Sequence, residues 1–248
     1  MLNNQEFFDE LSDQYDSMIP FEKAIEMKKK LFKNLLKGSN KTIADVGCGT
    51  GSDSLALVEM GYKVVSFDSS TKMLDKARLN ARSRGLDLDS YHFGALEITD
   101  DFNGNFDIVI SFGNTFANIE TEIFQSSIKK CYDLLNEQGS LFIQVLNYDL
   151  ILKEKKRIVN ITENEEHFFI RFYDFIKNDV KFNILKFSKI DTKENKLMTT
   201  TVHPHTAKDF NNSILKAGFK SVKLFSDSNR NIFDVYTSKD LIIEAVKS

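Results

Sequence analysis

The feature that most constrains the fold is an alternation of short apolar runs with helically periodic segments between about residues 41 and 146. Buried parallel strands read as such runs, and helices between them cover both faces of the sheet. The expected order is strand 41–46, helix 52–60, strand 63–67, helix 71–84, strand 88–93, strand 106–112, helix about 119–135 and strand 140–146. This pattern predicts an α/β fold with a doubly wound, mostly parallel sheet, whose ligands bind beyond the carboxyl ends of the strands.

The segments on either side of this alternation complete the expected architecture. A helix over 21–37 precedes it, and four strand-like runs separated by polar turns fill the region from about 157 to 203. A helix over 206–218 and strands over 220–226 and 232–238 then return to the main sheet, while 241–246 reads equally as strand or helix. We expect a single domain, 1–248, with a helical segment 1–38, a core of 39–150 and 204–248, and an antiparallel β insert at about 155–203.

Composition narrows the range of partners. With 33 Lys and Arg against 36 Asp and Glu, the net charge of −3 favours neither a nucleic acid nor an anionic membrane as partner. The sequence has neither a basic, apolar leader nor an apolar run of the ~20 residues that a membrane span needs. Cys48 and Cys131 lack metal-ligand spacing and suit a reduced compartment, so we expect a cytoplasmic protein without a metal site. Strand edges in the insert could pair with another subunit, giving a homo-oligomer.

A glycine-rich turn follows the first predicted strand. Gly47, Gly49 and Gly51 stand between Asp45 at the end of that strand and the next helix. Such a turn can direct backbone N–H groups at a ligand and lets the ligand approach closely. The spacing G-x-G-x-G differs from the G-x-G-x-x-G of dinucleotide sites. Ser52 and Asp53 could also cap the helix, so part of the motif has a structural interpretation.

An acidic residue ends the second predicted strand. Asp68 lies beside the glycine turn in a doubly wound sheet, where a carboxylate can accept hydrogen bonds from both hydroxyls of a ribose. Alternatively, Asp68 is an exposed cap for the helix that follows, and one carboxylate can both cap the helix and bind a ribose. Together the turn and Asp68 predict a nucleoside-containing ligand.

Residues 43–77, from Ile43 to Ala77, resemble the opening half of class I S-adenosylmethionine-dependent methyltransferases. The stretches FDIVISFGNTFANI, VLNYDLIL and VHPHTAKDFNNSILKAGF are similar, more narrowly, to the glycine N-methyltransferase and glycine/sarcosine methyltransferase group. The resemblance covers most of residues 10–220. It implies a seven-stranded Rossmann-like sheet and a methyltransferase that takes its methyl group from S-adenosyl-L-methionine.

The resemblance also implies site residues. The residues expected to bind the cofactor are Asp45, Gly47, Cys48, Gly49, Gly51, Asp68, Ser69, Met73, Ala95, Leu96, Phe112, Gly113 and Asn114. Those expected at the methyl acceptor are Asn147, Tyr148 beside it, and Tyr15 from an N-terminal segment that closes over the cofactor. His203 or His205 could serve as a general base, because histidine titrates near neutrality.

Two positions depart from the pattern of the resemblance. Many members of the superfamily recognise adenine with a polar side chain after the third strand, where this sequence has Ala95 and Leu96, so backbone groups or Glu97 would have to serve. Glycine-specific enzymes place a basic residue early in the insert, where this sequence has Glu165. Arg171 could instead clamp a substrate carboxylate, or simply face solvent.

We therefore predict methyl transfer to a small molecule, on an amine nitrogen, by alignment of acceptor and donor. Asn147 could orient a neutral amine without titrating. One alternative is a nucleic-acid methyltransferase, although FGNTF lacks the Asn/Asp-Pro-Pro-aromatic signature of base-amino methylases. Others are a non-catalytic protein that binds S-adenosylmethionine and, because the glycine spacing differs, less readily an NAD-dependent dehydrogenase.

Overall fold

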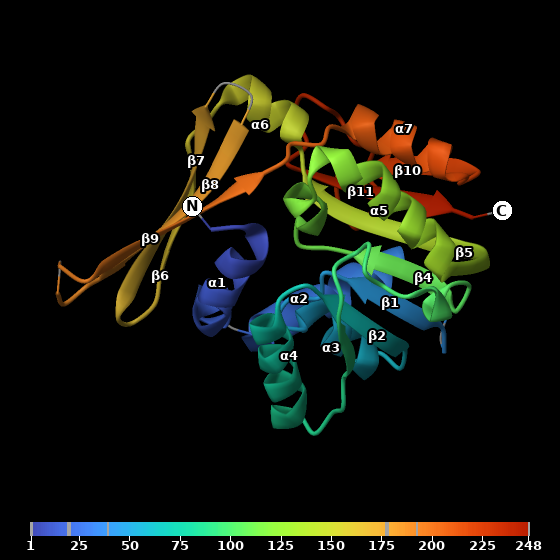
Figure 1. Cartoon of the computed structure of the whole chain (residues 1–248), viewed down its shortest axis with the longest axis horizontal. Coiled ribbons are helices and arrows are strands. Elements are labelled where there is room, and N and C mark those ends of the chain that lie inside the picture. The colour runs from blue at the N-terminus through green and yellow to red at the C-terminus, as the bar shows by residue number, and fades with distance from the viewer. Residues whose placement is uncertain (1, 19–20, 39, 177–178, 192, 248) are drawn as a thin grey trace.

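The chain forms two β-sheets with helices around the larger one (Figure 1). The computed structural model describes residues 2–18, 21–38, 40–176, 179–191 and 193–247. The larger sheet has seven strands in the order β10-β11-β5-β4-β1-β2-β3, and the smaller has four in the order β6-β7-β8-β9. The strands of the larger sheet are β1 (Thr42–Val46), β2 (Lys63–Asp68), β3 (Asp89–His92), β4 (Phe106–Ser111), β5 (Leu135–Leu146), β10 (Ser221–Phe225) and β11 (Asp240–Val246).

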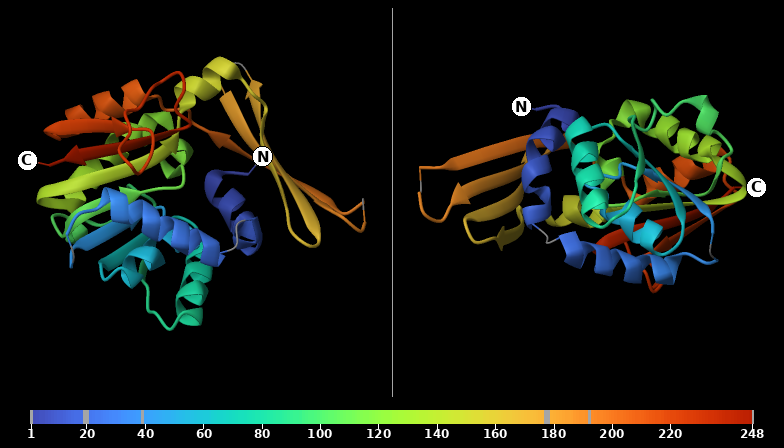
Figure 2. Two further views of the ribbon diagram at one scale, coloured as in Figure 1. Left: turned by 180° about the vertical axis from the view of Figure 1, so that it is seen from behind. Right: turned by 90° about the horizontal axis from the view of Figure 1, so that it is seen from below.

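The seven-stranded sheet is parallel except at one edge. Strands β3, β2, β1, β4 and β5 pair in parallel, whereas β11 is antiparallel to both β5 and β10. The helices between the parallel strands lie on both faces, and the N-terminal helix α1 lies between this sheet and the smaller one (Figure 2). Because the parallel strands all end at the same edge, the loops after them gather there.

Side-chain caps begin two of the helices, and a glycine ends one of them. Ser70 caps α4 by accepting a hydrogen bond from the backbone N–H of Met73 at 3.1 Å, and Thr206 with Asp209 forms a capping box at α7. Gly218, with φ of 109°, ends α7 in the left-handed conformation. The α-helices are α1 (Asn4–Met18), α2 (Phe21–Leu35), α3 (Ser52–Glu59), α4 (Thr71–Ser83), α5 (Thr121–Leu134), α6 (Tyr148–Glu154) and α7 (Ala207–Ala217), with 3₁₀ turns η1 (Asp100–Phe102) and η2 (Thr115–Asn118). No helix in these ranges has the length and apolar character that crossing a membrane requires.

The smaller sheet is an antiparallel insert after β5. Its strands are β6 (Ile158–Glu163), β7 (His167–Ile176), β8 (Asp179–Ser188) and β9 (Asn195–Val202). One face of the insert packs on α1 through Phe169, Ile184 and Met198, which meet Phe7 and Leu11. Alternate residues of each strand therefore point toward the body of the molecule.

The main core has a cluster on each face of the large sheet. Val109 and Ile143 belong to the cluster beneath α5 and α7, and Ile43 and Ile108 to the cluster beneath α2 and α3. Alternation along β4 places neighbouring residues on opposite faces, as the apolar runs of the sequence predict. The sheet is thus packed against helices on both faces.

The predicted fold class is confirmed, including the antiparallel insert after the fifth strand. The ambiguous segment 241–246 lies within strand β11. The strand predicted over 232–238 is wrong: this segment makes one isolated bridge, between Ile232 and Phe225, and then turns. The backbone N–H of Tyr236 donates to the Asp234 side chain at 2.7 Å, so local turn bonds replace a strand ladder.

Candidate functional site

A cavity of about 340 Å³ opens at the carboxyl edge of the large sheet. Its residues follow β4, β1, β2 and β3, and helices α1 and α2 close it from the other side. The lining residues are Asn4, Phe8, Tyr15, Phe21, Ala24, Lys28, Val46, Gly47, Cys48, Gly49, Thr50, Ser52, Asp53, Asp68, Ser69, Met73, Phe93, Gly94, Ala95, Phe112, Gly113, Thr115, Asn118 and Ile119. Ten of the predicted site residues are in this set: Tyr15, Gly47, Cys48, Gly49, Asp68, Ser69, Met73, Ala95, Phe112 and Gly113.

The glycines of the β1–α3 turn have different tasks. Gly47 has a φ of 82°, and a Cβ there would lie 2.3 Å from Cγ2 of Thr115, so Gly47 is required by packing. Gly49 has a φ of 54°, and a Cβ there would meet no atom within 4 Å and would point into open space. Gly51 lies outside the cavity lining, and its Cβ would lie 3.1 Å from Cβ of Ala77. Of these three glycines, only Gly49 therefore borders open space that a ligand can occupy.

The N–H groups of this turn bond within the chain. The N–H groups of Gly47 and Cys48 both donate to the carbonyl of Phe67, at 2.8 and 3.0 Å. The N–H of Gly49 donates to Oδ2 of Asp68 at 2.8 Å. The turn therefore offers a ligand close backbone approach, whereas these three N–H groups are already engaged.

Asp68 is held in place by backbone donors. Besides the bond from Gly49, Oδ1 of Asp68 accepts from the N–H of Ser70 at 2.9 Å. Burial raises the pKa of Asp68, while the two backbone bonds oppose that shift. Each carboxylate oxygen retains a further lone pair, so Asp68 can accept the two hydroxyls of a ribose.

Asp45, predicted at the cofactor, lies beneath the turn and not on the cavity lining. Its side chain is buried, and Oδ2 accepts a hydrogen bond at 2.6 Å from Ser54, whose hydroxyl also lies 2.8 Å from that of Ser66. Burial, reinforced by the charge of Asp53, raises the pKa of Asp45 to about 8. Asp45 therefore joins β1, β2 and α3 instead of facing the cavity.

An ion pair that the sequence did not single out lies in the cavity. Nζ of Lys28, from α2, is 2.7 and 2.8 Å from the two carboxylate oxygens of Asp53, and it lies 5.8 Å from the centre of the Phe112 ring. Burial disfavours the charge of Lys28, but the Asp53 carboxylate outweighs it and raises the pKa of Lys28. In the sequence, the run Lys28-Lys29-Lys30 is typical of a solvated helix face. Only the packing of α2 on α3 shows that Lys28, unlike Lys29 and Lys30, lines the cavity.

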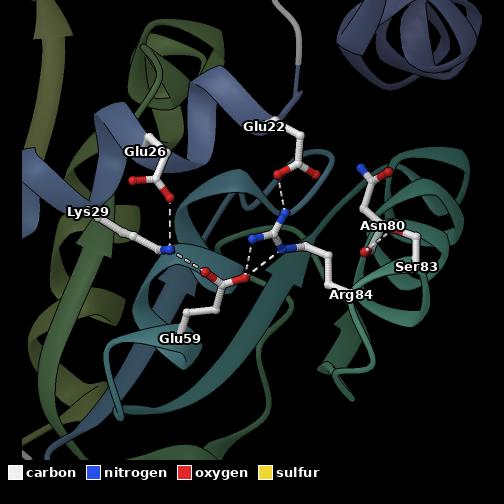
Figure 3. A network of polar contacts seen from close by, with 7 residues as sticks. All are labelled: Glu22, Glu26, Lys29, Glu59, Asn80, Ser83 and Arg84. Carbon is white, nitrogen blue, oxygen red and sulfur yellow. Dashed lines mark hydrogen bonds and ion pairs between the residues drawn. The ribbon is translucent and has the colours of Figure 1, made fainter.

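The helix that carries Lys28 is held by a charged network along one side of α2 (Figure 3). Arg84 pairs with Glu22 and, at 2.5 Å, with Glu59. Lys29 also pairs with Glu59 and, at 3.0 Å, with Glu26. The network links α2 to the end of α3 and to the residue after α4, which fixes the α2 wall of the cavity.

Helix α1 forms the remaining wall. Tyr15 lines the cavity and is 38% exposed, as expected for an aromatic residue at its rim. Nδ2 of Asn4 donates to the carbonyl of Asn118 at 2.7 Å, and the hydroxyl of Thr200 donates to Oδ1 of Asn4. Asn4 thus links η2, the 3₁₀ turn that follows β4, to strand β9 of the insert.

The loop after β4 reaches the cavity through Phe112 and Gly113. Asn114, predicted to bind the cofactor, lies behind the lining with a φ of 70°. Its Oδ1 accepts from the N–H of Leu146 at 3.0 Å, and its Nδ2 donates to the hydroxyl of Tyr148 at 2.8 Å. Tyr148, predicted at the acceptor, is buried and also lies outside the lining. Both residues hold the loop in place because their polar atoms are used within the fold.

Asn147, predicted at the acceptor, has its side chain engaged within the fold. It is 1% exposed and caps α6, with Oδ1 accepting from the N–H of Leu150 at 3.3 Å. Its Nδ2 donates to the carbonyls of Val235 and Ser238 at 3.0 and 2.9 Å. These bonds tie the end of β5 to the loop before β11, and the residue does not line the cavity.

The histidines at the end of the insert do not line the cavity either. The backbone N–H of His203 donates to the carbonyl of Ala117 at 2.7 Å, which joins β9 to η2. His205 stacks on Phe124, and its Nε2 lies 2.8 Å from the carbonyl of Ile119. Burial lowers the pKa of His205, as expected for a packed ring. The geometry gives these residues a role in packing the insert junction.

The segment after β3 lines the far end of the cavity with backbone and apolar groups. Phe93, Gly94 and Ala95 are in the lining together with Ser69 and Met73 from the β2–α4 connection. Leu96 is exposed outside the lining. Glu97 is engaged elsewhere, because its Oε2 accepts from the N–H of Gly94 at 2.6 Å. A flat ring bound here would meet apolar surface and main-chain atoms.

Arg171 lies on the face of the insert that is turned toward the body of the molecule. It stands between Phe169 and Tyr173 on β7, and these two residues pack into separate clusters around α1 and around η2 with α6. Within the described residues its guanidinium makes no hydrogen bond or ion pair, and Tyr15 is near enough to act on it electrostatically. Burial lowers the pKa of Arg171, so this cation is partly desolvated. Such a group is suited to an anionic partner.

The larger sheet, with the cavity at its carboxyl edge, has the fold of S-adenosylmethionine-dependent methyltransferases of known structure. Residues 43–139 match the family profile described as "Methyltransferase domain". The CcbJ methyltransferase of Streptomyces caelestis has a TM-score of 0.79 at 18% identity, with 98% of each chain covered. The match of residues 43–139 agrees with the predicted methyltransferase class, and the likeness to CcbJ agrees with the predicted fold.

Among individual proteins, the chain is similar to N-methyltransferases. It is 33% identical over 151 residues to the glycine/sarcosine N-methyltransferase of Parasynechococcus marenigrum (strain WH8102), which is 60% of this chain and 54% of that protein. It is 35% identical over 124 residues to human glycine N-methyltransferase, covering 44% of this chain and 42% of that protein. The chain spans about half the length of the curated relatives it matches.

Proposed function

We propose that this chain is an S-adenosylmethionine-dependent methyltransferase that methylates the amine nitrogen of a small molecule carrying a carboxylate. One observation carries the proposal: a single cavity combines Asp68 and an apolar segment after β3 with the Lys28–Asp53 ion pair on the side of β4. Asp68 and the apolar segment suit the ribose and the base of a nucleoside, and the ion pair suits a zwitterionic amino acid. S-adenosylmethionine contains a nucleoside and a zwitterionic amino acid.

The residues present fit this donor. Gly49 leaves open space where any side chain would project, and Asp68 keeps acceptor capacity for a ribose. Phe93 and Ala95 provide an apolar surface for a base. Lys28 and Asp53 would receive the carboxylate and the ammonium of the methionyl end. When bound, the donor supplies an electrophilic methyl group on a sulfonium.

The contribution of the protein is to position the acceptor and exclude water. Tyr15 and Phe112 place aromatic surface along the cavity, and aromatic faces favour a neighbouring cation. Arg171 approaches from the insert and would hold a carboxylate of the acceptor, leaving its amine directed toward the cavity. Holding the reactants at near-attack geometry can lower the barrier by roughly 7–11 kcal/mol.

We further propose that the chain acts in the cytoplasm as one unit made of the helical segment 1–38, the core and the insert. Two buried, unpaired cysteines, Cys48 and Cys131, support a reducing compartment. The contacts of α1 with the insert on one side and with α4 and η2 of the core on the other support a single unit, because separating them would expose Phe7 and Leu11.

Two measurements test the proposal. Calorimetric titration should detect binding of S-adenosylhomocysteine and none of NADH, and the opposite preference would refute the choice of donor. For the acceptor, Arg171→Met should raise KM for a carboxylated amine by about ten- to a hundredfold, as expected for loss of a charged hydrogen bond, and Arg171→Lys by less. KM for an amine without a carboxylate should stay unchanged in both variants. Equal effects on the two kinds of amine would contradict a role in recognising the carboxylate.

A further inference from the structure

The insert has a second face, turned away from α1 and the large sheet (Figure 1). Phe169 and Tyr173 point inward, so Ile170 and Phe172, which alternate with the inward residues of β7, point outward. Ile170 is one of these outward residues. It belongs to no apolar cluster of the described residues, although the preceding residue, Phe169, is buried.

An apolar row crosses all four strands on this outer face. Ile170 lies directly opposite Ile161 on β6 and Leu185 on β8, and Leu185 lies opposite Leu197 on β9. Residues directly opposite one another share a face of the sheet. Ile161 is 59% exposed and Leu197 is 56% exposed, so the row is open to solvent at both ends.

A register shift enlarges this apolar surface. The pairing of β6 with β7 skips between Ile158 and Asn160, so that Ile158 lies opposite Phe172. Ile158 consequently shares the outer face with Ile161, although the two are three residues apart, and it is 53% exposed. A contiguous apolar patch of this kind marks an interaction surface, whereas single exposed residues do not.

The charges at the two ends of β6 indicate what covers the patch. The exposed residues Lys155, Lys156 and Arg157 precede the strand, and the exposed residues Glu163, Glu165 and Glu166 end or follow it. Lys156 and Glu165 form no ion pair among the described residues. A strand that is basic at one end and acidic at the other is complementary to a second copy of itself that runs in the opposite direction.

We infer that the outer face of the insert is the interface of a symmetric homodimer, in which the β6 strands of two copies run antiparallel. A two-fold axis places the same patch on both partners, and it brings the basic end of one β6 against the acidic end of the other. The two apolar rows then bury each other as stacked sheets. A membrane surface fits less well, because the rim of the patch carries both signs of charge.

The dimer would also bear on the methyl acceptor site. Arg171 and Ile170 are neighbours on β7 that face opposite ways, so the strand that forms the inner wall also forms the interface. Covering the outer face would restrict the motion of β7 and with it the position of Arg171. This surface is a separate feature from the donor cavity, and its test does not depend on the proposed reaction.

Sedimentation velocity of the full chain over a wide range of concentrations tests the inference. Wild type should sediment as a dimer, and Ile161→Lys should weaken dimerisation about tenfold or more. Leu79→Lys, on α4, is the matched control because Leu79 is 58% exposed, and it should leave the dimer unchanged. Circular dichroism melting of each variant separates loss of the dimer from loss of the fold.

A charge exchange tests the orientation of the two copies. Lys156→Glu should weaken the dimer, and combining it with Glu165→Lys should restore it, because the opposite charges then meet again across the axis. A wild-type chain that stays monomeric at every concentration would overturn the inference, as would a dimer that Ile161→Lys leaves intact. A double variant no stronger than the single one would overturn the antiparallel arrangement of β6.

Discussion

Gly49→Ala should separate ligand binding from folding in the glycine turn. Gly49 has a φ of 54°, a conformation that costs a residue with a side chain roughly 1–2 kcal/mol. The added methyl meets no protein atom within 4 Å, so no further clash adds to that cost. The methyl would instead project into the cavity, where overpacking against a bound donor costs about 1–3 kcal/mol. We therefore expect S-adenosylhomocysteine to bind roughly fivefold to over a hundredfold more weakly.

Gly61→Ala is the control for this substitution. Gly61 has a φ of 87°, its Cβ would also meet no atom within 4 Å, and it lies outside the cavity lining. Urea denaturation should give both variants a similar loss of unfolding free energy, whereas calorimetry should find weaker binding only for Gly49→Ala. The reasoning is refuted if Gly49→Ala binds the ligand as wild type does, or if Gly61→Ala weakens binding equally.

Two further predictions concern buried polar residues near the site. Asn147→Ala removes a helix cap and two bonds to backbone carbonyls, so urea denaturation should give an unfolding free energy about 2–4 kcal/mol lower, with little change in donor affinity by calorimetry. Unchanged stability with lost turnover would instead support direct contact between Asn147 and the acceptor. Burial and Asp53 raise the pKa of Asp45 to about 8, so wild type should lose unfolding free energy as the pH rises from about 4 to 8. Asp45→Asn should lose less over that range in urea titrations at several pH values, and identical pH profiles would exclude Asp45 as the source.

The fold was predictable because its signals are local and repeated. Apolar runs, caps and glycine stops such as Gly218 each report on a few neighbouring residues, and together they indicate a parallel sheet and its insert. The prediction of a strand over 232–238 was wrong because the apolar residues of this segment resemble a strand. Asp234 instead accepts a hydrogen bond within a turn, which only the three-dimensional structure reveals.

Much of the cavity lining was also predictable, since Gly47, Gly49 and Asp68 follow neighbouring strands and must meet at one edge of the sheet. The Lys28–Asp53 pair was not, because it depends on how α2 packs against α3. Asn147 and Tyr148 were predicted at the acceptor by resemblance alone. Their placement behind the cavity depends on bonds to Ser238 and Asn114, which are distant in the sequence.

The alternation along β7 has a consequence for insertions and deletions in the turn between β6 and β7. Because the side-chain period of a strand is two, a slip of one residue would turn Arg171 outward and Ile170 inward. A cation would then stand in an apolar seam, and an aliphatic residue would replace it beside Tyr15. A change in the length of that turn, far from any reacting atom, would thus exchange the two faces of β7 if this strand is the one that slips.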